Sequence, residues 1–436
     1  MQRSAIILGV LLVCATGAVA RLADRPYLDA ARLAARWIDA ATIRTPRGLT
    51  WPADPQNAKT VTTSLYSGTP GVLLFDVALA RATGDPAYLE RASGGADWLL
   101  ASLEQEDSAG LYEGLAGIGF TLHEVFKATR DPKYDAGVRL VVRRLKDQAK
   151  RVGRGVEWSA TTDIISGNAG TGLFLLYLAN ESKDESAREL AISAGERLIE
   201  VGQPERGGTK WAMDPTYPRL MPNFSHGTAG VAYFLATLYQ QTKRRPFLDA
   251  ATSGAKYLQA VAKTDGDTCL IFHDEPTGRD LYYLGWCHGP AGTGRLFYRL
   301  YQATGDPAWL DWAHRSARAL LASGIPEHET PGFWNNVGLC CGDAGVAEYV
   351  LGLYRASKRA EYLAFAKRVT AHLLATGTRD DTGLRWMHAE NRVRPKEVLA
   401  QTGYMQGASG IGMWLLQLDA ADGGRDLGLR LPDNPF

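Results

Sequence analysis

Three cysteines stand directly in front of two glycine motifs, where their thiols could bind one metal ion. Cys287 lies in the phrase Trp-Cys-His-Gly, and Cys340 and Cys341 lie farther along the chain in the phrase Leu-Cys-Cys-Gly. Zinc accepts three thiolate ligands and then keeps a fourth position for water or a substrate, which is the arrangement of a catalytic site. The sequence therefore predicts a Zn²⁺ site formed by these three residues.

A disulfide is the alternative use of the same cysteines. Thiols tend to pair in an oxidising compartment, and a bridge from Cys287 to Cys340 is geometrically plausible. A bridge between the neighbours Cys340 and Cys341 would be strained, so the adjacent pair favours a metal. Cys269 lies outside the glycine motifs, and we interpret it as a buried or incidental thiol.

His226 and Asp163 are the predicted acid–base residues. His226 stands directly in front of a glycine motif, as the three cysteines do, one motif before that of Cys287. Its imidazole titrates near neutral pH, which suits an acid–base residue. Asp163 precedes the motif before that of His226 and could orient His226 or hold a substrate. The alternatives are a packed structural histidine and a helix cap. His288 is expected to support a thiolate, and solvent-exposed positions are expected for the remaining polar residues of these loops, His273, Asp274, His388 and Glu390.

The glycine motifs are one unit repeated seven times. Each has the pattern Gly-x-x-Gly and is followed by an apolar run, and the second glycines are 46 to 65 residues apart: Gly71, Gly117, Gly170, Gly230, Gly292, Gly345 and Gly410. The runs are apolar on nearly all sides, which predicts buried helices. Small residues at the start of these helices would let their backbones crowd together at one end.

A second recurring phrase predicts an outer layer of helices. Asp-Pro followed by an aromatic residue, or a close variant, begins amphipathic segments at Gly84, Arg130, Arg244, Gly305 and Lys358. Asp caps a helix and Pro fits its first turn. Seven glycine-led inner helices surrounded by seven outer ones predict an all-α fold, an α/α toroid of seven helical hairpins. The loops that enter the inner helices are the expected place for a site, because helix N-termini gather there.

Tryptophans recur in those loops. Each precedes a glycine motif, and together they are Trp51, Trp158, Trp211, Trp286, Trp334 and Trp386. One interpretation is packing across the end of the toroid, and the other is an aromatic cleft for a peptide or a sugar.

The N-terminus resembles a secretory signal. Arg3 precedes an apolar run that ends in Ala-Val-Ala at residue 20. We expect a signal peptide over residues 1–20, a single domain over 21–436, and export to the periplasm or the medium. A single N-terminal membrane anchor is the alternative, and no later stretch is apolar enough to span a membrane. With 48 basic and 47 acidic residues the chain lacks the charge excess of a nucleic-acid binder.

Taken together, the seven motifs and the Trp-Cys-His-Gly and Cys-Cys-Gly phrases make the mature chain resemble the lanthionine synthetase C-like family. The resemblance implies an α/α toroid with zinc at its rim. It also implies addition of a cysteine thiolate to a dehydroalanine or dehydrobutyrine, which forms a thioether. By the same resemblance Cys287, Cys340 and Cys341 match the zinc ligands, His226 the acid–base histidine and Asp163 a motif aspartate.

The sequence departs from the family pattern at named positions. The third ligand is commonly histidine and is Cys341 here, as in some of the cyclases, and Tyr283 stands where the family has an arginine. The family's cyclases work in the cytoplasm, whereas export is expected here. The resemblance implies a peptide, or a small thiol and an activated alkene, as substrate. The alternatives are a carbohydrate-active toroid that uses two carboxylates such as Asp163 and Asp343, and a non-catalytic protein stapled by zinc.

Overall fold

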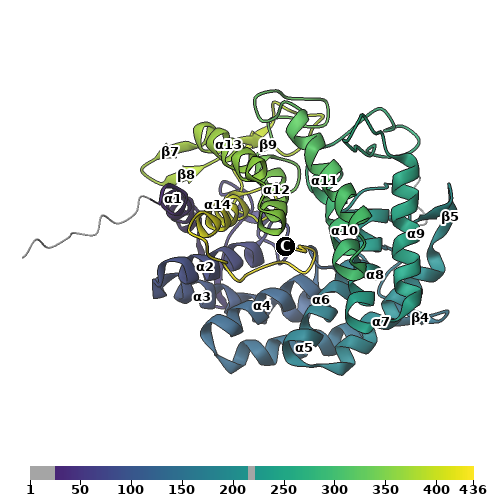
Figure 1. Cartoon of the computed structure of the whole chain (residues 1–436). Helices are drawn as coiled ribbons and strands as arrows, with labels where there is room; N and C mark the ends of the chain where they lie inside the picture. The colour runs from purple at the N-terminus through teal and green to yellow at the C-terminus, as the bar shows by residue number, and fades with distance from the viewer. Residues whose placement is uncertain (1–24, 215–220) are drawn as a thin grey trace, which may run out of the picture.

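The computed structural model describes residues 25–214 and 221–436, and in this part the chain forms a closed ring of helices (Figure 1). The inner layer consists of the glycine-led helices, which are buried on nearly every side. They are α2 (Thr69–Thr83), α4 (Leu115–Thr129), α6 (Asn168–Ser182), α8 (Thr228–Thr242), α10 (Pro290–Thr304), α12 (Asp343–Ser357) and α14 (Ala408–Asp422). The predicted all-α toroid of seven hairpins is confirmed.

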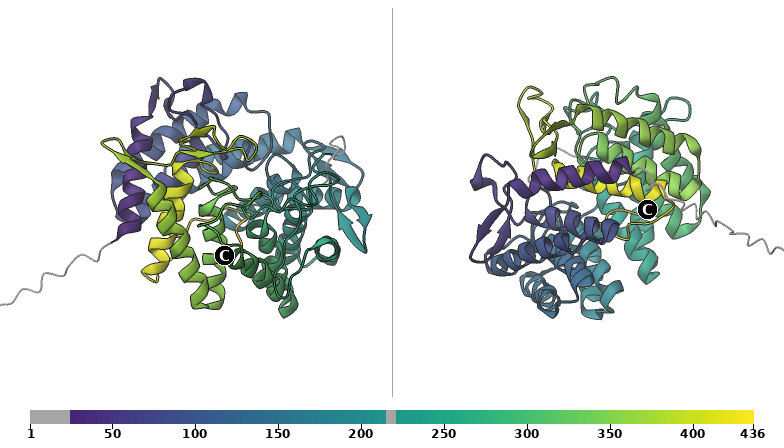
Figure 2. Two further views of the ribbon diagram at one scale, coloured as in Figure 1. Left: turned by 90° about the horizontal axis from the view of Figure 1, so that it is seen from above. Right: turned by 90° about the vertical axis from the view of Figure 1, so that its left-hand side faces the viewer.

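The outer layer pairs one amphipathic helix with each inner helix. Six outer helices follow their inner partners along the chain: α3 (Pro86–Ser102), α5 (Pro132–Gln148), α7 (Glu185–Val201), α9 (Arg245–Val261), α11 (Pro307–Ala322) and α13 (Ala360–Thr376). The seventh is α1 (Pro26–Ala40), which packs on α14, so that the first and the last helix of the described residues close the ring (Figure 2). The expected order of inner and then outer helix is therefore wrong for the last hairpin.

Caps explain where several outer helices begin. Asp85, Asp131 and Asp306 each accept a hydrogen bond from the backbone amide two residues on, and Pro follows each of them. Asp184 caps α7 in the same way without a proline. The helices α9 and α13, whose phrases lack the aspartate, begin without a side-chain cap.

Short β-hairpins follow four outer helices and carry the chain to the tryptophans. They pair β1 (Ile43–Thr45) with β2 (Gly48–Thr50), β3 (Lys150–Val152) with β4 (Gly155–Glu157), β5 (Gln203–Glu205) with β6 (Gly208–Lys210), and β7 (Thr378–Asp380) with β8 (Gly383–Arg385). Trp158, Trp211 and Trp386 then donate their indole N–H to carbonyls near the C-termini of α5, α7 and α13. Each of these three indoles therefore packs against the end of an outer helix.

A ring of backbone hydrogen bonds joins the seven loops that enter the inner helices. Each loop donates to the next with N···O distances of 2.8 to 3.2 Å: Tyr66 to Tyr112, Tyr112 to Ile165, Ile164 to Ser225, Ser225 to Cys287, Cys287 to Cys340, Cys340 to Met405, and Met405 back to Tyr66. The acceptor residue always stands five positions before the second glycine of its motif. The ring therefore brings equivalent positions of neighbouring repeats side by side.

The second glycine of each motif makes this ring possible. A Cβ atom on Gly292 would lie 1.9 Å from the carbonyl oxygen of Trp286, and one on Gly345 would lie 1.9 Å from that of Leu339. Both carbonyls belong to the residue just before a predicted zinc ligand. The close approach of loop and helix therefore requires glycine, as the sequence predicted.

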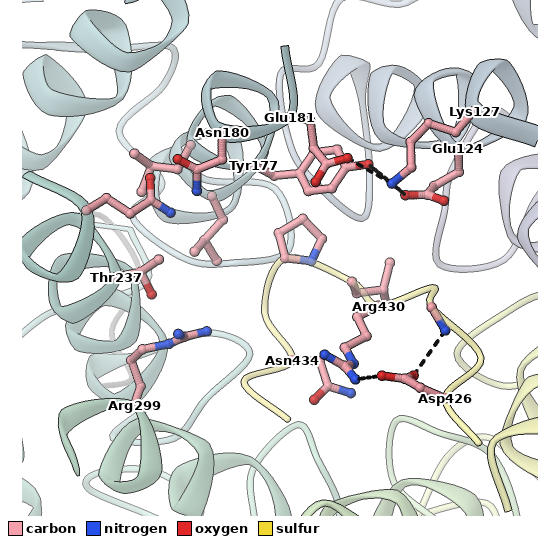
Figure 3. Close-up of a pocket in the computed structure, with 16 residues that line it drawn as sticks. Glu124, Lys127, Tyr177, Asn180, Glu181, Thr237, Arg299, Asp426, Arg430 and Asn434 are labelled. Carbon is pink, nitrogen blue, oxygen red and sulfur yellow. Dashed lines mark hydrogen bonds and ion pairs between the residues drawn. The ribbon is translucent and has the colours of Figure 1, made fainter. Parts of the chain in front are cut away.

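The C-terminal segment after α14 crosses the opposite mouth of the toroid. Asp426, Arg430 and Asn434 of this segment face side chains from α4, α6, α8 and α10 across a cavity of about 310 Å³ (Figure 3). Asp433 turns inward and is fully buried. Its carboxylate accepts hydrogen bonds from Trp286 Nε1 at 3.1 Å and from the Tyr112 hydroxyl at 3.2 Å. The segment thus reaches the underside of the loop that carries Cys287.

The predicted signal peptide, residues 1–20, lies outside the described residues. Over residues 25–214 and 221–436, no helix has the combined length and hydropathy that a bilayer span requires.

Candidate metal centre

The three predicted zinc ligands lie together at the rim. Cys287 Sγ is 3.2 Å from Cys341 Sγ, and Cys341 Sγ is 3.3 Å from Cys340 Sγ. The backbone ring accounts for this, because the Cys287 amide donates to the Cys340 carbonyl at 3.0 Å. All three side chains are buried, and their sulfurs lie within 4.8 Å of one another.

The sulfurs are not bonded to each other. A disulfide holds its sulfurs about 2.05 Å apart, and the four cysteines in the described part of the chain are free. Zinc–sulfur bonds of about 2.3 Å in a tetrahedral site place sulfurs about 3.8 Å apart. A shift of roughly half an ångström would therefore fit the three sulfurs around zinc.

The electrostatics of the cluster also fit a cation. Hydrogen bonds from Cys287, Cys341 and the Tyr66 hydroxyl hold the pKa of Cys340 well below its usual value. Burial, and hydrogen bonding to the other two cysteines, raise the pKa of Cys287 well above its usual value. Three buried thiolates repel one another, so a divalent cation is what would let all three ionise.

The cluster opens into a cavity of about 400 Å³, the metal cavity. His226, Trp286 and Trp334 line this cavity with the three cysteines, and so does the segment around Arg392. Its volume is that of a small-molecule or peptide side-chain site. Trp286 and Trp334 are thus the tryptophans of the predicted set that line the cavity of the candidate centre.

His226 and Asp163 form a hydrogen-bonded dyad at the cavity. His226 Nδ1 lies 2.6 Å from Asp163 Oδ2, while Asp163 Oδ1 accepts from the amides of Ser166 and Gly167 at 2.9 and 2.8 Å. Asp163 therefore anchors the loop and orients the imidazole at the same time. Burial alone would lower the pKa of His226, but the hydrogen bond and charge of Asp163 outweigh it, and the pKa is raised.

Aromatic rings form one wall of the cavity. His273 stacks on Tyr283 with ring centroids 4.3 Å apart, and His288 meets the edge of His273 at 4.4 Å. Burial lowers the pKa of His288 well below its usual value, so its ring is neutral. The expected solvent exposure of Asp274 and His388 is wrong, because both are buried.

Three further residues lie at the centre and are not among the site residues predicted from the sequence. Gln406 donates to Cys341 Sγ at 3.9 Å and to the Tyr66 hydroxyl at 3.0 Å. Tyr66 and Gln406 stand in repeats one and seven at the positions of Cys340 and Cys341, so alignment of the motifs could have found them. Arg392 donates to the Tyr283 hydroxyl at 3.3 Å from a loop that belongs to no repeat.

The carboxylate pair of the carbohydrate alternative does not share a cavity. Asp343 binds His372 Nδ1 at 3.0 Å and lines a separate cavity behind Trp334. Asp163 faces His226 at the metal cavity. The expectation that Asp163 and Asp343 flank one substrate is therefore wrong.

Solved structures share the toroid. Nisin cyclase is similar with a TM-score of 0.64 and 16% identity, over 89% of this chain and 93% of that chain. The α-1,6-mannanase from Salegentibacter sp. HEL1_6 is similar with a TM-score of 0.52 and 17% identity, over 91% and 99%. An unsaturated glucuronyl hydrolase specific for heparin has a TM-score of 0.52 and 12% identity, over 93% and 100%. At these identities the likeness shows the fold alone.

The sequence itself matches one family over most of its length. The model of the lanthionine synthetase C-like protein family covers residues 59–424, which include all seven glycine motifs. The matched range also contains the three cysteines and the histidine–aspartate dyad. The chain belongs to the lanthionine synthetase C-like family.

Proposed function

We propose that this protein is a zinc-dependent enzyme that adds a thiol to a dehydroamino acid in a peptide, or to a similarly activated alkene, and so forms a thioether. One observation carries the proposal: the three-cysteine cluster and the His226–Asp163 dyad open into the same cavity. Family membership supports the same chemistry.

Cys287, Cys340 and Cys341 would hold the zinc ion, and bound zinc lowers the pKa of a substrate thiol so that the thiol is a thiolate at neutral pH. With three thiolate ligands the centre carries a net negative charge. That charge makes a substrate sulfur more nucleophilic and the metal a weaker Lewis acid.

His226 is the proposed acid–base residue. Its Nδ1 is held by Asp163, so Nε2 is the nitrogen that is available to the substrate. Nε2 takes the proton of the substrate thiol. The sulfur then forms a bond to the β-carbon, the carbon–carbon π bond breaks, and its electron pair moves toward the carbonyl as an enolate. Nε2 returns the proton to the α-carbon, so the net reaction adds the thiol across the double bond.

Arg392 is proposed to stabilise the enolate. Tyr283 replaces the arginine that the family pattern places before the first zinc ligand, and the hydroxyl of Tyr283 accepts a hydrogen bond from Arg392. The guanidinium lines the metal cavity. A cation at this place favours negative charge that develops on the carbonyl oxygen.

Metal analysis and a thiol-addition assay test the proposal together. We expect about one zinc per chain in protein purified without chelators, and loss of that zinc in a Cys340→Ser/Cys341→Ser variant. We also expect thioether formation with a dehydroalanine peptide, and a decrease of about 100-fold or more in His226→Ala, which keeps its zinc. Zinc-loaded protein that adds no thiol to any dehydroalanine peptide would contradict the enzymatic role.

We further propose export by a signal peptide over residues 1–20, because of the basic start and the apolar run that follows it. N-terminal sequencing of protein isolated from the producing cell would test it. A mature chain that begins just after Ala20 is the expected result, and an intact Met1 in protein from the cytoplasm would contradict it.

A further inference from the structure

A second cavity of about 260 Å³ lies on the other side of Trp334 from the metal centre. Its walls come from the loop before α12, the first residue of α12, the end of α13 and the segment after β8. Phe333, Trp334 and Trp386 give it three aromatic walls. Apart from Trp334, none of these residues lines the cavity of the metal centre.

His388 and Asn335 line this cavity, and each has a buried hydrogen-bond acceptor atom without a partner. His388 is 2% exposed, and its Nε2 donates to the carbonyl of Gln406 at 2.6 Å. Burial lowers the pKa of His388 to about 4, so the ring is neutral and its Nδ1 carries a lone pair. This Nδ1 has no partner, and neither does Oδ1 of Asn335, whose amide nitrogen donates to Pro395. Each of these two acceptor atoms would be satisfied by a hydrogen-bond donor.

Carboxylates add negative charge. Glu327 and Glu329 lie at the exposed edge of the cavity, and Asp343 lies inside it, paired with His372. Glu327 has Arg368 at 3.6 Å, and both of these side chains are about half exposed. Among the described residues that line the cavity, none is lysine or arginine, and the one basic side chain with a raised pKa, His372, is held by Asp343. A cavity lined by both carboxylates and aromatic rings favours an organic cation.

The cavity is placed to receive part of a substrate bound at the metal centre. Trp334 lines both cavities, and the segment after β8 contributes His388 to one and Arg392 to the other. Within the described residues, the large hydrophobic side chains that are exposed all belong to this stretch of chain, at Met387, Val393 and Val398. Two of them, Met387 and Val393, flank the segment from His388 to Arg392 that runs from one cavity to the other.

We propose that this cavity is a subsite for a guanidinium or ammonium group on a side chain of the peptide substrate. Its position relative to the reacting thiol rests on the proposed function. Its preference for a cation does not, because the acceptors, the carboxylates and the aromatic walls are independent of the metal. The substrate class is therefore a peptide with arginine or lysine near the modified residue.

Binding of two matched small probes to the zinc-loaded full chain tests the subsite. Nα-acetyl-arginine amide is expected to bind, and Nα-acetyl-citrulline amide, which has nearly the same shape without the charge, is expected to bind about tenfold more weakly or not at all. Titration calorimetry measures both. Glu327→Gln/Glu329→Gln should weaken the arginine probe several-fold, whereas Glu361→Gln, on the exposed face of α13 outside the cavity, should not.

An activity assay distinguishes the cation subsite from the proposed thiol-addition function. Dehydroalanine peptides that carry either arginine or citrulline beside the cysteine should differ in KM more than in kcat, and the difference should shrink in Glu327→Gln/Glu329→Gln. Probe binding without thiol addition would contradict the enzymatic role and support the cation subsite. Equal binding of the two probes, or binding that the double variant leaves unchanged, would overturn the subsite.

Discussion

Cys341 stands at the same position in its repeat as His226 and His288, because each lies four residues before the second glycine of its motif. The fold therefore accepts imidazole and thiol at equivalent rim positions. We predict that Cys341→His retains about one zinc per chain, because imidazole is also a zinc ligand. Cys341→Ser should weaken zinc binding by more than about 100-fold, because loss of a ligand costs more affinity than loss of a group that supports a ligand. Competition with a chromophoric chelator measures both. Equal affinity in the serine variant and the parent would exclude Cys341 as a ligand.

The dyad gives a prediction about pH. Asp163→Asn removes the carboxylate that outweighs burial, so the pKa of His226 should fall. In the parent protein the folded-state pKa of His226 is raised above the unfolded value of about 6.5. The stability that this pair contributes is thus fully present below about pH 6.5 and is lost as the pH rises through the raised folded-state pKa.

Two measurements check this prediction. An NMR titration of ¹³C-labelled histidine should show the His226 signal moving to a lower pKa in Asp163→Asn. Urea unfolding should show a stability difference between parent and variant that narrows from pH 5.5 to pH 9. His372→Gln is a control, because it removes the other histidine–aspartate pair of the described chain away from the metal cavity. An unchanged pKa in Asp163→Asn would contradict the role given to this carboxylate.

At the scale of elements, the repeat predicted nearly everything that follows a glycine motif. The inner helices, the outer helices and the proximity of Cys287 to Cys340 all follow from equivalent positions in neighbouring repeats. Features outside the repeat were missed. Arg392 reaches the cavity from a loop between β9 (His388–Ala389) and β10 (Val398–Leu399), and α1 closes the ring from the other end of the chain. Periodicity says nothing about contacts between segments that do not repeat.

The loop–helix contact at each motif gives a prediction for Gly345. In Gly345→Ala the added Cβ would lie 1.9 Å from the carbonyl oxygen of Leu339, so the loop that carries Cys340 must move. We expect a loss of stability of about 3 kcal/mol, as for overpacking of a core, and weaker zinc binding. Thermal unfolding and zinc stoichiometry measure the two effects.

Gly84→Lys is the matched control for this glycine. Gly84 has φ of +75° and open space around it, and equivalent turns carry Arg130, Lys183 and Lys243 at φ of 58° to 62°. A lysine there should cost only about 1 kcal/mol and leave zinc binding unchanged. Equal zinc loss in the two variants would mean that glycine at the motif serves general stability and does not position the ligand loop.

At the scale of the whole molecule, the C-terminal segment connects the two mouths of the toroid. Asp433 is buried between Trp286 and Tyr112, with Arg295 Nη1 at 3.9 Å, and Arg295 also pairs with Glu348 at 2.6 Å. Trp286 immediately precedes Cys287. Asp433 thus supports the loop that carries Cys287 (the metal loop) from inside the barrel, although nothing in the repeat pattern predicts this contact.

Replacement of Asp433 should therefore affect both stability and metal retention. In Asp433→Ala the indole N–H of Trp286 loses its acceptor and Arg295 loses one of its two carboxylates, which should cost about 3 kcal/mol of unfolding free energy. Zinc release to a chelator should become faster, because the loop before Cys287 loses its support. Asp426→Ala, which removes an exposed ion pair with Arg430 from the same segment, should cost less than about 1 kcal/mol and leave zinc release unchanged. Faster release in both variants would assign the effect to the segment as a whole, and unchanged release in Asp433→Ala would show that the metal loop is rigid without this support.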